Sequence, residues 1–445
     1  MDEETRICLI GEVCVDLTLT DPTQENKLRF GGVVHPARAL WALDVPYLFG
    51  YTGPDYLTRQ VEKYVNSFGA SVIQKIGNVI GSPNVIFIAE PKETGPQGYE
   101  FILRDEYQNS FNDEDLTKLL KDNDISDIII FAGKFSLSSI LEECQKTKAK
   151  IHIDLGNASG DLAEILPMGN KVETIFLSTS SEIFNYYYQG SIARLQTDVL
   201  DGFSQSFVFK ENRGGSRYFT KTLAEEIIQV GAQLRPIVHS VGVGDCFDVV
   251  FVEKIAKHPV KTALSYASWI AAEYAATTYP DDFRAGCERI FSILPEEIVK
   301  VPGITLAWEE RPTRPIYIAA PDFDYLDRSQ IEKVINSLRY HNFNPRLPIR
   351  ENGQMGVEAT AERKEQLFTA DIKLLDECDL VIAVLIENDP GTLIEIGLSK
   401  AMGIPVIVYD PYGMAKNLML TQLPDLVSSD LDLVISKVFE IFSKG

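Results

Sequence analysis

Cysteine, histidine and methionine are scarce in this chain of 445 residues, which has six cysteines, five histidines and six methionines. The cysteines form no C-x-x-C pair, and their spacing to the histidines is not that of a metal site. This scatter favours a reducing compartment in which each cysteine serves as a small apolar residue. The cysteines are Cys8, Cys14, Cys144, Cys246, Cys287 and Cys378.

Long apolar runs are also lacking, since none approaches the 18 residues of a membrane-spanning helix. The chain opens with Met-Asp-Glu-Glu, and its first apolar stretch, from Ile7, has the length of a strand and is broken at Glu12. No secretory signal is therefore expected. The sequence predicts a cytoplasmic protein with no membrane contact.

Basic residues are few relative to acidic ones. The chain has 42 Lys and Arg against 64 Asp and Glu, which gives a formal net charge of -22. This balance argues against binding to nucleic acid phosphates or an anionic membrane, because both need clustered basic side chains. Small anions remain possible ligands, since backbone amides at a helix N-terminus can bind them.

The remaining composition is that of a folded protein, with 45% hydrophobic and 24% charged residues. The length predicts two or perhaps three domains. Short apolar runs alternate with helical patterns, which indicates an α/β protein with parallel sheets covered by helices. The expected strands are ICLIG, DIIIFAG, KIHIDLG, TIFLS and SFVFK, then PIYIAA, DLVIAVLI and PVIVY.

A break in this alternation lies near residues 296–315, where VPGITLAWEERPTRP contains three prolines and one glycine. Turn and breaker residues of this kind are typical of a domain boundary. We therefore expect one domain over residues 1–304 and a second, smaller domain over residues 305–445.

The first domain contains a glycine turn, Gly242-Val243-Gly244, followed by Asp245 and an apolar helical pattern over 249–255. Two glycines beside a helix start let backbone amides converge on an anion. An aspartate there can take the proton of a hydroxyl that attacks a phosphoryl group. Taken alone, Asp245 is better interpreted as an N-cap in a tight turn, since aspartate is a favoured cap.

The order of motifs around this turn resembles the ribokinase (PfkB) family of sugar and nucleoside kinases over about residues 5–298. The motifs are Gly11, Asp16, Gly31-Gly32, Gly53-Pro54-Asp55, Asp154, Ser178-Thr179-Ser180-Ser181-Glu182 and Lys210 to Gly215. The resemblance implies a ribokinase-like three-layer fold that uses ATP and Mg²⁺.

The same resemblance implies roles for individual residues. Asp245 would be the catalytic base, and the turn at Gly242, Val243 and Gly244 would hold the transferred phosphate. Asp16, Gly31 and Gly32 would contact the acceptor. Glu182 would organise Mg²⁺ near the phosphates without a direct metal ligand from the protein, and the loop from Lys210 to Gly215 would border ATP.

Several residues differ from the family pattern. His239-Ser240 replaces an Asp-Thr pair that belongs to a monovalent-cation site, and His35 or Pro36 replaces an asparagine after the double glycine. Thr179 replaces another asparagine, and Asp248 and Val250 replace small residues. An active kinase and a non-catalytic nucleotide or nucleoside sensor both remain compatible with the sequence.

Two carboxylates of the second domain lie on apolar helix faces. A helix over 362–377 has its apolar stripe at Leu367, Phe368, Leu374, Leu375 and Cys378, and Asp371 falls in the middle of it. A carboxylate on such a stripe borders a pocket or carries a desolvation cost. Glu395 lies on a helix that follows Asp389-Pro390 and is apolar at Leu393, Ile394, Ile396, Leu398 and Ala401, which predicts burial against a sheet.

These residues resemble the nucleoside 2-deoxyribosyltransferase family over about residues 314–442, within a flavodoxin-like parallel sheet. The resemblance implies that Glu395 is the nucleophile at the anomeric carbon and that Tyr317 positions it. It implies that Asp371 and Asp389 contact the nucleoside and help to protonate the leaving base. Asn417 and Met419 would belong to a segment that a neighbouring subunit contributes, which implies a homo-oligomer.

The sequence thus predicts a bifunctional enzyme of nucleoside or nucleotide metabolism. Its second domain would cleave or transfer at an N-glycosidic bond without a cofactor, and its first would phosphorylate a sugar or nucleoside with ATP and Mg²⁺. Its partners would be small-molecule substrates and further copies of itself. The alternative is a first domain that binds a nucleotide without turnover and regulates the second.

Overall fold

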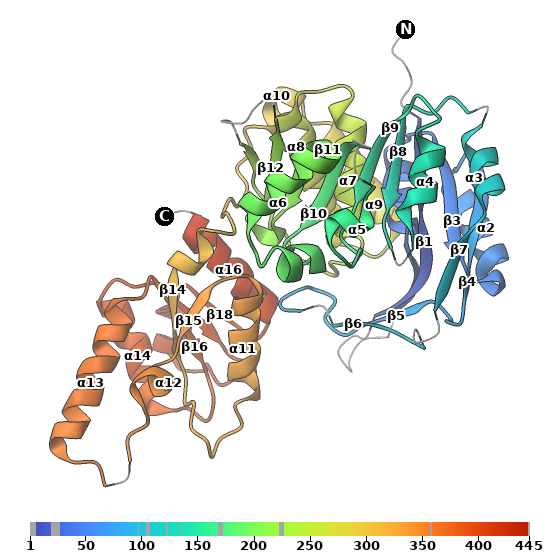
Figure 1. The fold of residues 1–445 in the computed structure, drawn as a ribbon. Helices are drawn as coiled ribbons and strands as arrows, with labels where there is room; N and C mark the ends of the chain where they lie inside the picture. The colour runs from blue at the N-terminus through green and yellow to red at the C-terminus, as the bar shows by residue number, and fades with distance from the viewer. Residues whose placement is uncertain are drawn as a thin grey trace. The chain divides into compact units, whose positions relative to one another are not determined.

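The computed structural model describes residues 6–18, 27–96, 98–103, 107–121, 123–133, 135–167, 172–221, 227–356 and 358–443. By its internal contacts the chain forms two compact units. The first comprises Met1–Lys92 and Gln97–Thr305, and the second comprises Glu93–Pro96 and Leu306–Gly445. This division lies beside the boundary expected at residues 304 and 305, and each unit contains its own sheet (Figure 1).

The first unit is organised around a sheet whose main path runs β13-β12-β11-β10-β9-β8-β1-β3-β4-β7. Its central strands, from β11 to β4, are parallel, and antiparallel strands flank them. The strands are β1 (Ile7–Thr18), β2 (Lys27–Gly32), β3 (Tyr47–Gly53), β4 (Val72–Ile80), β5 (Val85–Ile88), β6 (Tyr99–Phe101), β7 (Gln108–Phe111), β8 (Asp127–Phe131), β9 (Lys150–Asp154), β10 (Val172–Ser178), β11 (Ser204–Lys210), β12 (Ser216–Thr220) and β13 (Ile228–Val230).

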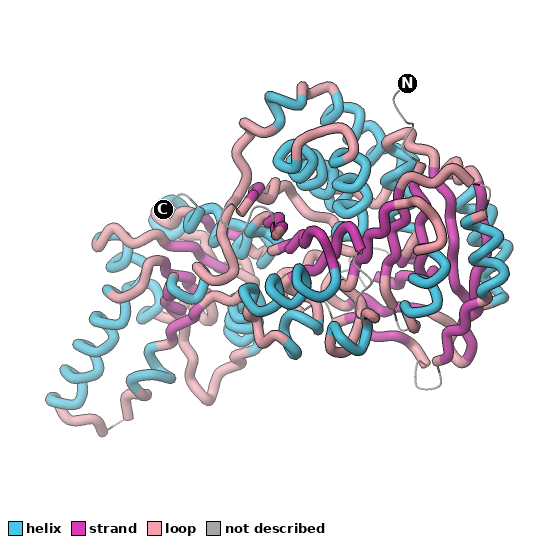
Figure 2. Tube along the Cα trace, turned by 45° about the horizontal axis from the view of Figure 1, so that its top comes forward, coloured by secondary structure: helices cyan, strands magenta, loops and turns pink. Residues whose placement is uncertain are grey.

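Helices cover both faces of this sheet, and the strands run between two groups of helices in Figures 1 and 2. One group packs α1, α7, α8 and α9 together, and α3 packs on α4 in the other. The helices are α1 (Val34–Ala42), α2 (Thr58–Asn66), α3 (Asp113–Leu120), α4 (Leu137–Cys144), α5 (Leu162–Ile165), α6 (Ile192–Asp198), α7 (Val243–Ile255), α8 (Val260–Ala275), α9 (Pro280–Phe291) and α10 (Pro295–Ile298). The predicted three-layer α/β architecture is therefore confirmed.

Strand β1 is longer than the sequence predicted. The expectation of a strand ending at Gly11 is wrong, because β1 continues to Thr18. Its first half pairs with β3 and β8 in the main sheet, and its second half pairs with β2 and β5. The pairing partners of the second half come from distant parts of the chain, so the apolar pattern alone did not show this extension. Asp16 consequently lies within a strand and not in a loop.

The second unit is a parallel five-stranded sheet with the order β15-β14-β16-β17-β18. Numbered along the unit, this order is 2-1-3-4-5, the order of flavodoxin-like folds. The predicted fold class of this unit is therefore confirmed. Its elements are β14 (Pro315–Ala319), α11 (Ser329–Tyr340), β15 (Asn344–Arg346), α12 (Pro348–Asn352), α13 (Ala361–Asp376), β16 (Leu380–Val384), α14 (Pro390–Ala401), β17 (Val406–Tyr409), α15 (Leu418–Gln422), β18 (Leu426–Ser428) and α16 (Leu431–Ser443).

Burial in the second unit differs from the prediction at three apolar residues. Phe368 of α13 is 66% exposed, and Leu393 and Ile394 of α14 are 37% and 68% exposed. The expectation that these residues face the core is wrong, because only one face of each helix, through Leu375 of α13 and Ile396 of α14, joins the core of the unit.

The six cysteines are all free and buried, as small apolar residues would be. Within the part of the chain that the structure describes, no helix combines the length and apolar character needed to cross a membrane.

Candidate functional site

The clearest candidate site of the second unit pairs a strand tyrosine with a helix glutamate. Tyr317 lies in β14 with its side chain almost fully buried, and its hydroxyl donates to Oε1 of Glu395 in α14 at 2.6 Å. The hydroxyl can reach the helix because β14 and α14 pack on each other. The structure therefore brings these two predicted residues together.

The carboxyl group of Glu395 has a pKa close to neutral pH. Burial and the nearby carboxylates Asp371 and Asp389 raise the pKa of Glu395 to about 7, although the hydrogen bond from Tyr317 lowers it. Burial and the charge of Glu395 also raise the pKa of Tyr317, so its hydroxyl stays protonated as a donor. Asp371 and Asp389 are therefore close enough to act on Glu395, and the three carboxyl groups form one acidic site.

Asp371 and Asp389 are each fixed by a neighbour. Asn352, the last residue of α12, donates its side-chain amide to Oδ1 of Asp371 at 2.8 Å. Asp389 is the N-cap of α14, where its Oδ2 accepts from the amide and hydroxyl of Thr392 at 2.7 and 2.9 Å. The sequence analysis missed Asn352, whose amide carries no distinguishing pattern in the sequence.

The loop that follows β14 adds residues that the sequence analysis did not single out. Asp322 is buried and accepts from both Nε and Nη2 of Arg350 in α12. The rings of Phe323 and Tyr325 stack at an interplanar angle of 3°, with Tyr325 75% exposed. Arg350 and Asn352 thus anchor α12 between this loop and Asp371, and the two rings offer a flat aromatic face beside the strand end.

Asn417 and Met419 lie on the exposed surface of the second unit. Asn417 is the N-cap of α15, and its side chain accepts from the backbone amide of Met419 at 2.9 Å. Leu418 and Met419 are 73% and 65% exposed. Leu420 of the same helix packs against the core cluster that contains Ile396 of α14. The two helices therefore share a core while Leu418 and Ile394 stay exposed.

The glycine turn of the first unit begins helix α7. Gly242 is the N-cap and has a positive φ of 75°, a left-handed conformation that favours glycine. The interpretation of Asp245 as an N-cap is wrong, because Asp245 lies inside the first turn of α7 and Gly242 takes the cap position. Burial, together with the charge of Asp154, raises the pKa of Asp245 to about 7.

Lys210 points into this region and is held by carboxylates. Its Nζ lies 2.8 Å from Oδ2 of Asp154 and 2.8 Å from Oδ2 of Asp248. A Cβ built on Gly244 would lie 3.2 Å from the same Nζ. Burial alone would lower the pKa of Lys210, but the two carboxylates outweigh it and raise that pKa, so the ammonium group stays charged.

Asp16 lies beside the Gly31-Gly32 pair and near the glycine turn at residues 242–244. A Cβ on Gly31 would lie 2.1 Å from Oδ1 of Asp16, so only glycine leaves room for this carboxylate. Gly32 has a positive φ of 61° where the chain enters α1. Asp16 also raises the pKa of Asp245, which places the predicted acceptor and phosphate residues near one another.

Two of the residues predicted to lie near ATP, Glu182 and Gly215, contact other parts of the first unit. Glu182 is exposed and accepts from the hydroxyl of Ser159 at 2.6 Å. Gly215, with a φ of 102°, lies in the turn between β11 and β12, where a Cβ would meet the carbonyl oxygen of Val230 at 2.3 Å. A glycine is therefore required at position 215, because any other side chain would clash with the backbone at Val230.

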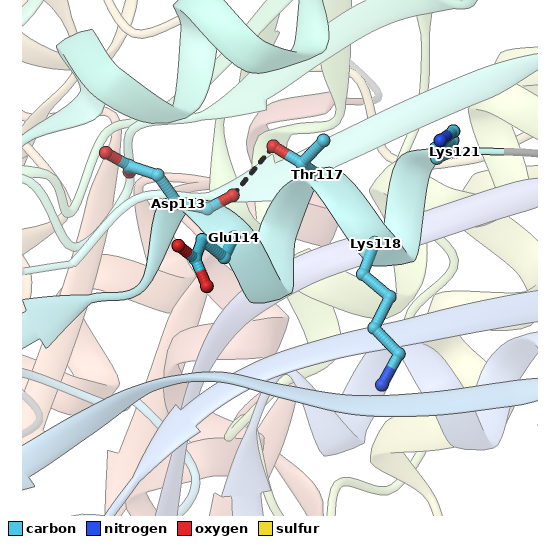
Figure 3. A pocket seen from close by; sticks show the side chains of 5 residues that line it. All are labelled: Asp113, Glu114, Thr117, Lys118 and Lys121. Atoms are coloured by element: carbon cyan, nitrogen blue, oxygen red, sulfur yellow. Dashed lines mark hydrogen bonds between the residues drawn. The ribbon is translucent and has the colours of Figure 1, made fainter.

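A surface hollow on α3 contains none of the predicted site residues. Figure 3 shows its lining side chains, which come from α3 and from Lys121 directly after it, with the hydroxyl of Thr117 bonded to the carbonyl oxygen of Asp113. The hollow is a charged helix face, lined by Asp113, Glu114, Thr117, Lys118 and Lys121. Among the described residues, no group of three or more His, Cys, Asp or Glu side chains is arranged to hold a metal ion.

Comparison with known proteins gives one family match, which lies within the second unit. Residues 316–423 match the family model of nucleoside 2-deoxyribosyltransferase. The match spans Tyr317, Asp371, Asp389 and Glu395, and confirms the predicted resemblance. No curated protein matches the chain.

The first unit is similar to solved ribokinase-type kinases, as the sequence predicted. Ribokinase of Arabidopsis thaliana, complexed with ribose and ATP, is 12% identical, with a TM-score of 0.46 over 65% of this chain and 99% of its own. Fructokinase of Xylella fastidiosa with bound ATP is 12% identical, with a TM-score of 0.47 over 66% and 99%. A putative ribokinase II of E. coli in complex with ATP and Mg²⁺ is 15% identical, with a TM-score of 0.44 over 65% and 99%.

Proposed function

We propose that the second unit cleaves or transfers at the N-glycosidic bond of a nucleoside, a deoxynucleoside or a corresponding monophosphate. The observation that carries this proposal is the 2.6 Å hydrogen bond from Tyr317 to Glu395, a half-buried carboxyl group whose pKa Asp371 and Asp389 raise. The family match over residues 316–423 supports the same chemistry.

The chemistry suits a carboxylate because N-glycosidic cleavage builds positive charge on the sugar. Tyr317 holds Oε1 of Glu395, which leaves Oε2 to form a bond with the anomeric carbon while the bond from that carbon to the base breaks. The departing base takes a proton delivered through Asp371 or Asp389. Water or a second base then attacks the same carbon and releases Glu395, so hydrolysis and base exchange share one site.

A second copy of the chain is proposed to cover the exposed apolar residues of the second unit. Ile394 and Leu418 lie on helices that share a core, and both are about 70% exposed. The segment at Asn417 and Met419 would then reach the site of a neighbouring copy. The active species is accordingly a homo-oligomer.

For the first unit, one candidate function that we propose is ATP-dependent phosphorylation of a sugar or nucleoside hydroxyl, with Asp245 as base. Its pKa of about 7 lets Asp245 take a proton near neutral pH. The turn at Gly242, Val243 and Gly244 is proposed to hold a phosphate, because backbone amides at a helix start can bind an anion and the Lys210 ammonium group lies beside Gly244. ATP with Mg²⁺ would supply the phosphoryl group.

A second candidate for the first unit is nucleotide or nucleoside binding without turnover, which would regulate the second unit. The ion pairs of Lys210 with Asp154 and Asp248 favour it. These ion pairs already engage the Lys210 ammonium group, which is the cation nearest the turn. A phosphate would therefore have to compete with two buried carboxylates for this ammonium group.

The first prediction tests the nucleophile. Glu395→Gln keeps the shape of the side chain but cannot attack, so release of free base from a nucleoside and nucleotide panel falls by on the order of 1000-fold or more. Chromatography of the products measures the release. Glu365→Gln removes an exposed carboxylate of α13 and serves as the matched control. Base release by Glu395→Gln at the wild-type rate would overturn the assignment.

The second prediction concerns pH. Glu395 must be ionised to attack, and its pKa is about 7, so kcat/KM for base release decreases as the pH falls below about 7. Tyr317→Phe removes the hydrogen-bond donor that lowers the pKa of Glu395. The pH below which kcat/KM falls should therefore rise by about one unit or more. A pH profile of both proteins measures the shift. An unmoved limb in Tyr317→Phe would show that the titrating group is not Glu395.

The third prediction separates the two candidates for the first unit. If the unit transfers a phosphoryl group, ATP·Mg²⁺ and a sugar or nucleoside yield ADP, and Asp245→Asn abolishes this formation. If the unit only binds, ATP saturates the protein without acceptor-dependent ADP. Coupled ADP detection and calorimetry distinguish the outcomes, and Asp124→Asn, at an exposed carboxylate, is the control.

The fourth prediction concerns assembly. A double variant, Ile394→Asp with Leu418→Asp, places charges on the exposed apolar residues and should reduce the particle to the 49.7 kDa monomer. Sedimentation velocity measures the mass. Leu294→Asp, at an apolar residue of the first unit that is 59% exposed, is the control. A wild-type protein that already sediments as a monomer contradicts the proposal.

A further inference from the structure

One buried imidazole lies between Asp16 and the glycine turn of the first unit. His35, the second residue of α1, is 2% exposed, and its Nε2 lies 2.9 Å from Oδ2 of Asp16. On the opposite side of the ring, Nδ1 lies 2.7 Å from the hydroxyl of Tyr274 and 3.1 Å from Nη1 of Arg38. Both ring nitrogens are therefore engaged.

The partners of the ring determine where its proton lies. The guanidinium of Arg38 can only donate, so Nδ1 accepts and Nε2 carries the hydrogen that is donated to Asp16. Burial lowers the pKa of His35 to about 4, so the ring is neutral at pH 7. Burial would raise the pKa of Asp16, but His35, Arg29 and Arg38 outweigh it and keep the carboxyl group ionised.

The ring also fills the space in front of the turn. A Cβ built on Gly242 would lie 2.1 Å from Cγ of His35, so the imidazole packs directly on the backbone of this glycine. On the other side of the carboxylate, a Cβ on Gly31 would lie 2.1 Å from Oδ1 of Asp16. The carboxylate of Asp16 is thus enclosed by the chain itself and is 1% exposed.

We propose that His35 takes the place that an acceptor hydroxyl would occupy on Asp16 and thereby excludes sugar and nucleoside acceptors from the first unit. The imidazole N–H offers Asp16 the same kind of hydrogen bond that a hydroxyl would. The ring also lies where an acceptor would have to approach the phosphate turn. This inference rests on the assignment of Asp16 and Gly242 to a kinase-like site.

His35 therefore determines which of the two candidate functions the first unit performs. With the ring in place, the turn can still meet the phosphates of a nucleotide, but no acceptor reaches Asp245. The unit then binds a nucleotide without phosphorylating a second substrate. Removal of the ring should open a hole of about its own size that is lined by an ionised carboxylate.

The experiment measures D-ribose binding to the full-length chain by calorimetry and by its effect on thermal unfolding. Wild type should show no binding, while His35→Ala should bind ribose at least roughly tenfold more tightly than wild type. His35→Asn keeps a donor for Asp16 on a smaller side chain, and it serves as the second variant if His35→Ala does not fold. Added imidazole should refill the hole in His35→Ala, restore its unfolding temperature and compete with ribose.

Two results would overturn the proposal. One is ribose binding to wild type as tightly as to the folded variant, which would show that the ring moves aside. The other is a folded variant that binds imidazole but not ribose. Ribose binding, ADP formation and base release are read separately in the same samples, so a variant that binds ribose without forming ADP contradicts the kinase proposal and supports the role of His35.

Discussion

A carboxylate removed from water must find donors or counter-charges within the protein, and both candidate sites are shaped by how this need is met. Glu395 has one neutral donor, Tyr317, and two acidic neighbours. These neighbours stabilise the ionised form of Glu395 only in part, so its pKa is about 7. A carboxyl group in that state can ionise and then form a bond, which is what a nucleophile requires.

Asp16 of the first unit shows the opposite arrangement. Asp16 accepts from His35, and the charges of Arg29 and Arg38 also lower its pKa. This carboxylate is satisfied by side chains of the chain itself, which leaves less for a ligand to gain by binding to it. In the kinase-like site that we propose for the first unit, the carboxylate that would meet an acceptor is therefore already engaged.

The sequence predicted the two sheets and the glycine turn because each follows from local spacing, and the resemblance to the nucleoside 2-deoxyribosyltransferase family implied the acidic set at Asp371, Asp389 and Glu395. It did not predict the extension of β1 to Thr18, because the partners of that segment, β2 and β5, are non-local. It noted Asp248 as a departure from small residues but did not pair it with Lys210. A carboxylate on an otherwise buried helix requires a counter-charge, and the lysine at the end of β11 was the available signal.

The two units also show why a raised pKa does not by itself identify a catalytic group. Asp245 and Glu395 both have pKa values of about 7, and burial is the largest cause in each. Glu395 is held by a neutral hydroxyl that leaves its second oxygen free to react. Asp245 lies next to a turn whose approach is filled by the ring of His35. The difference between the sites is therefore one of access, because a poised carboxyl group can act only on a substrate that reaches it.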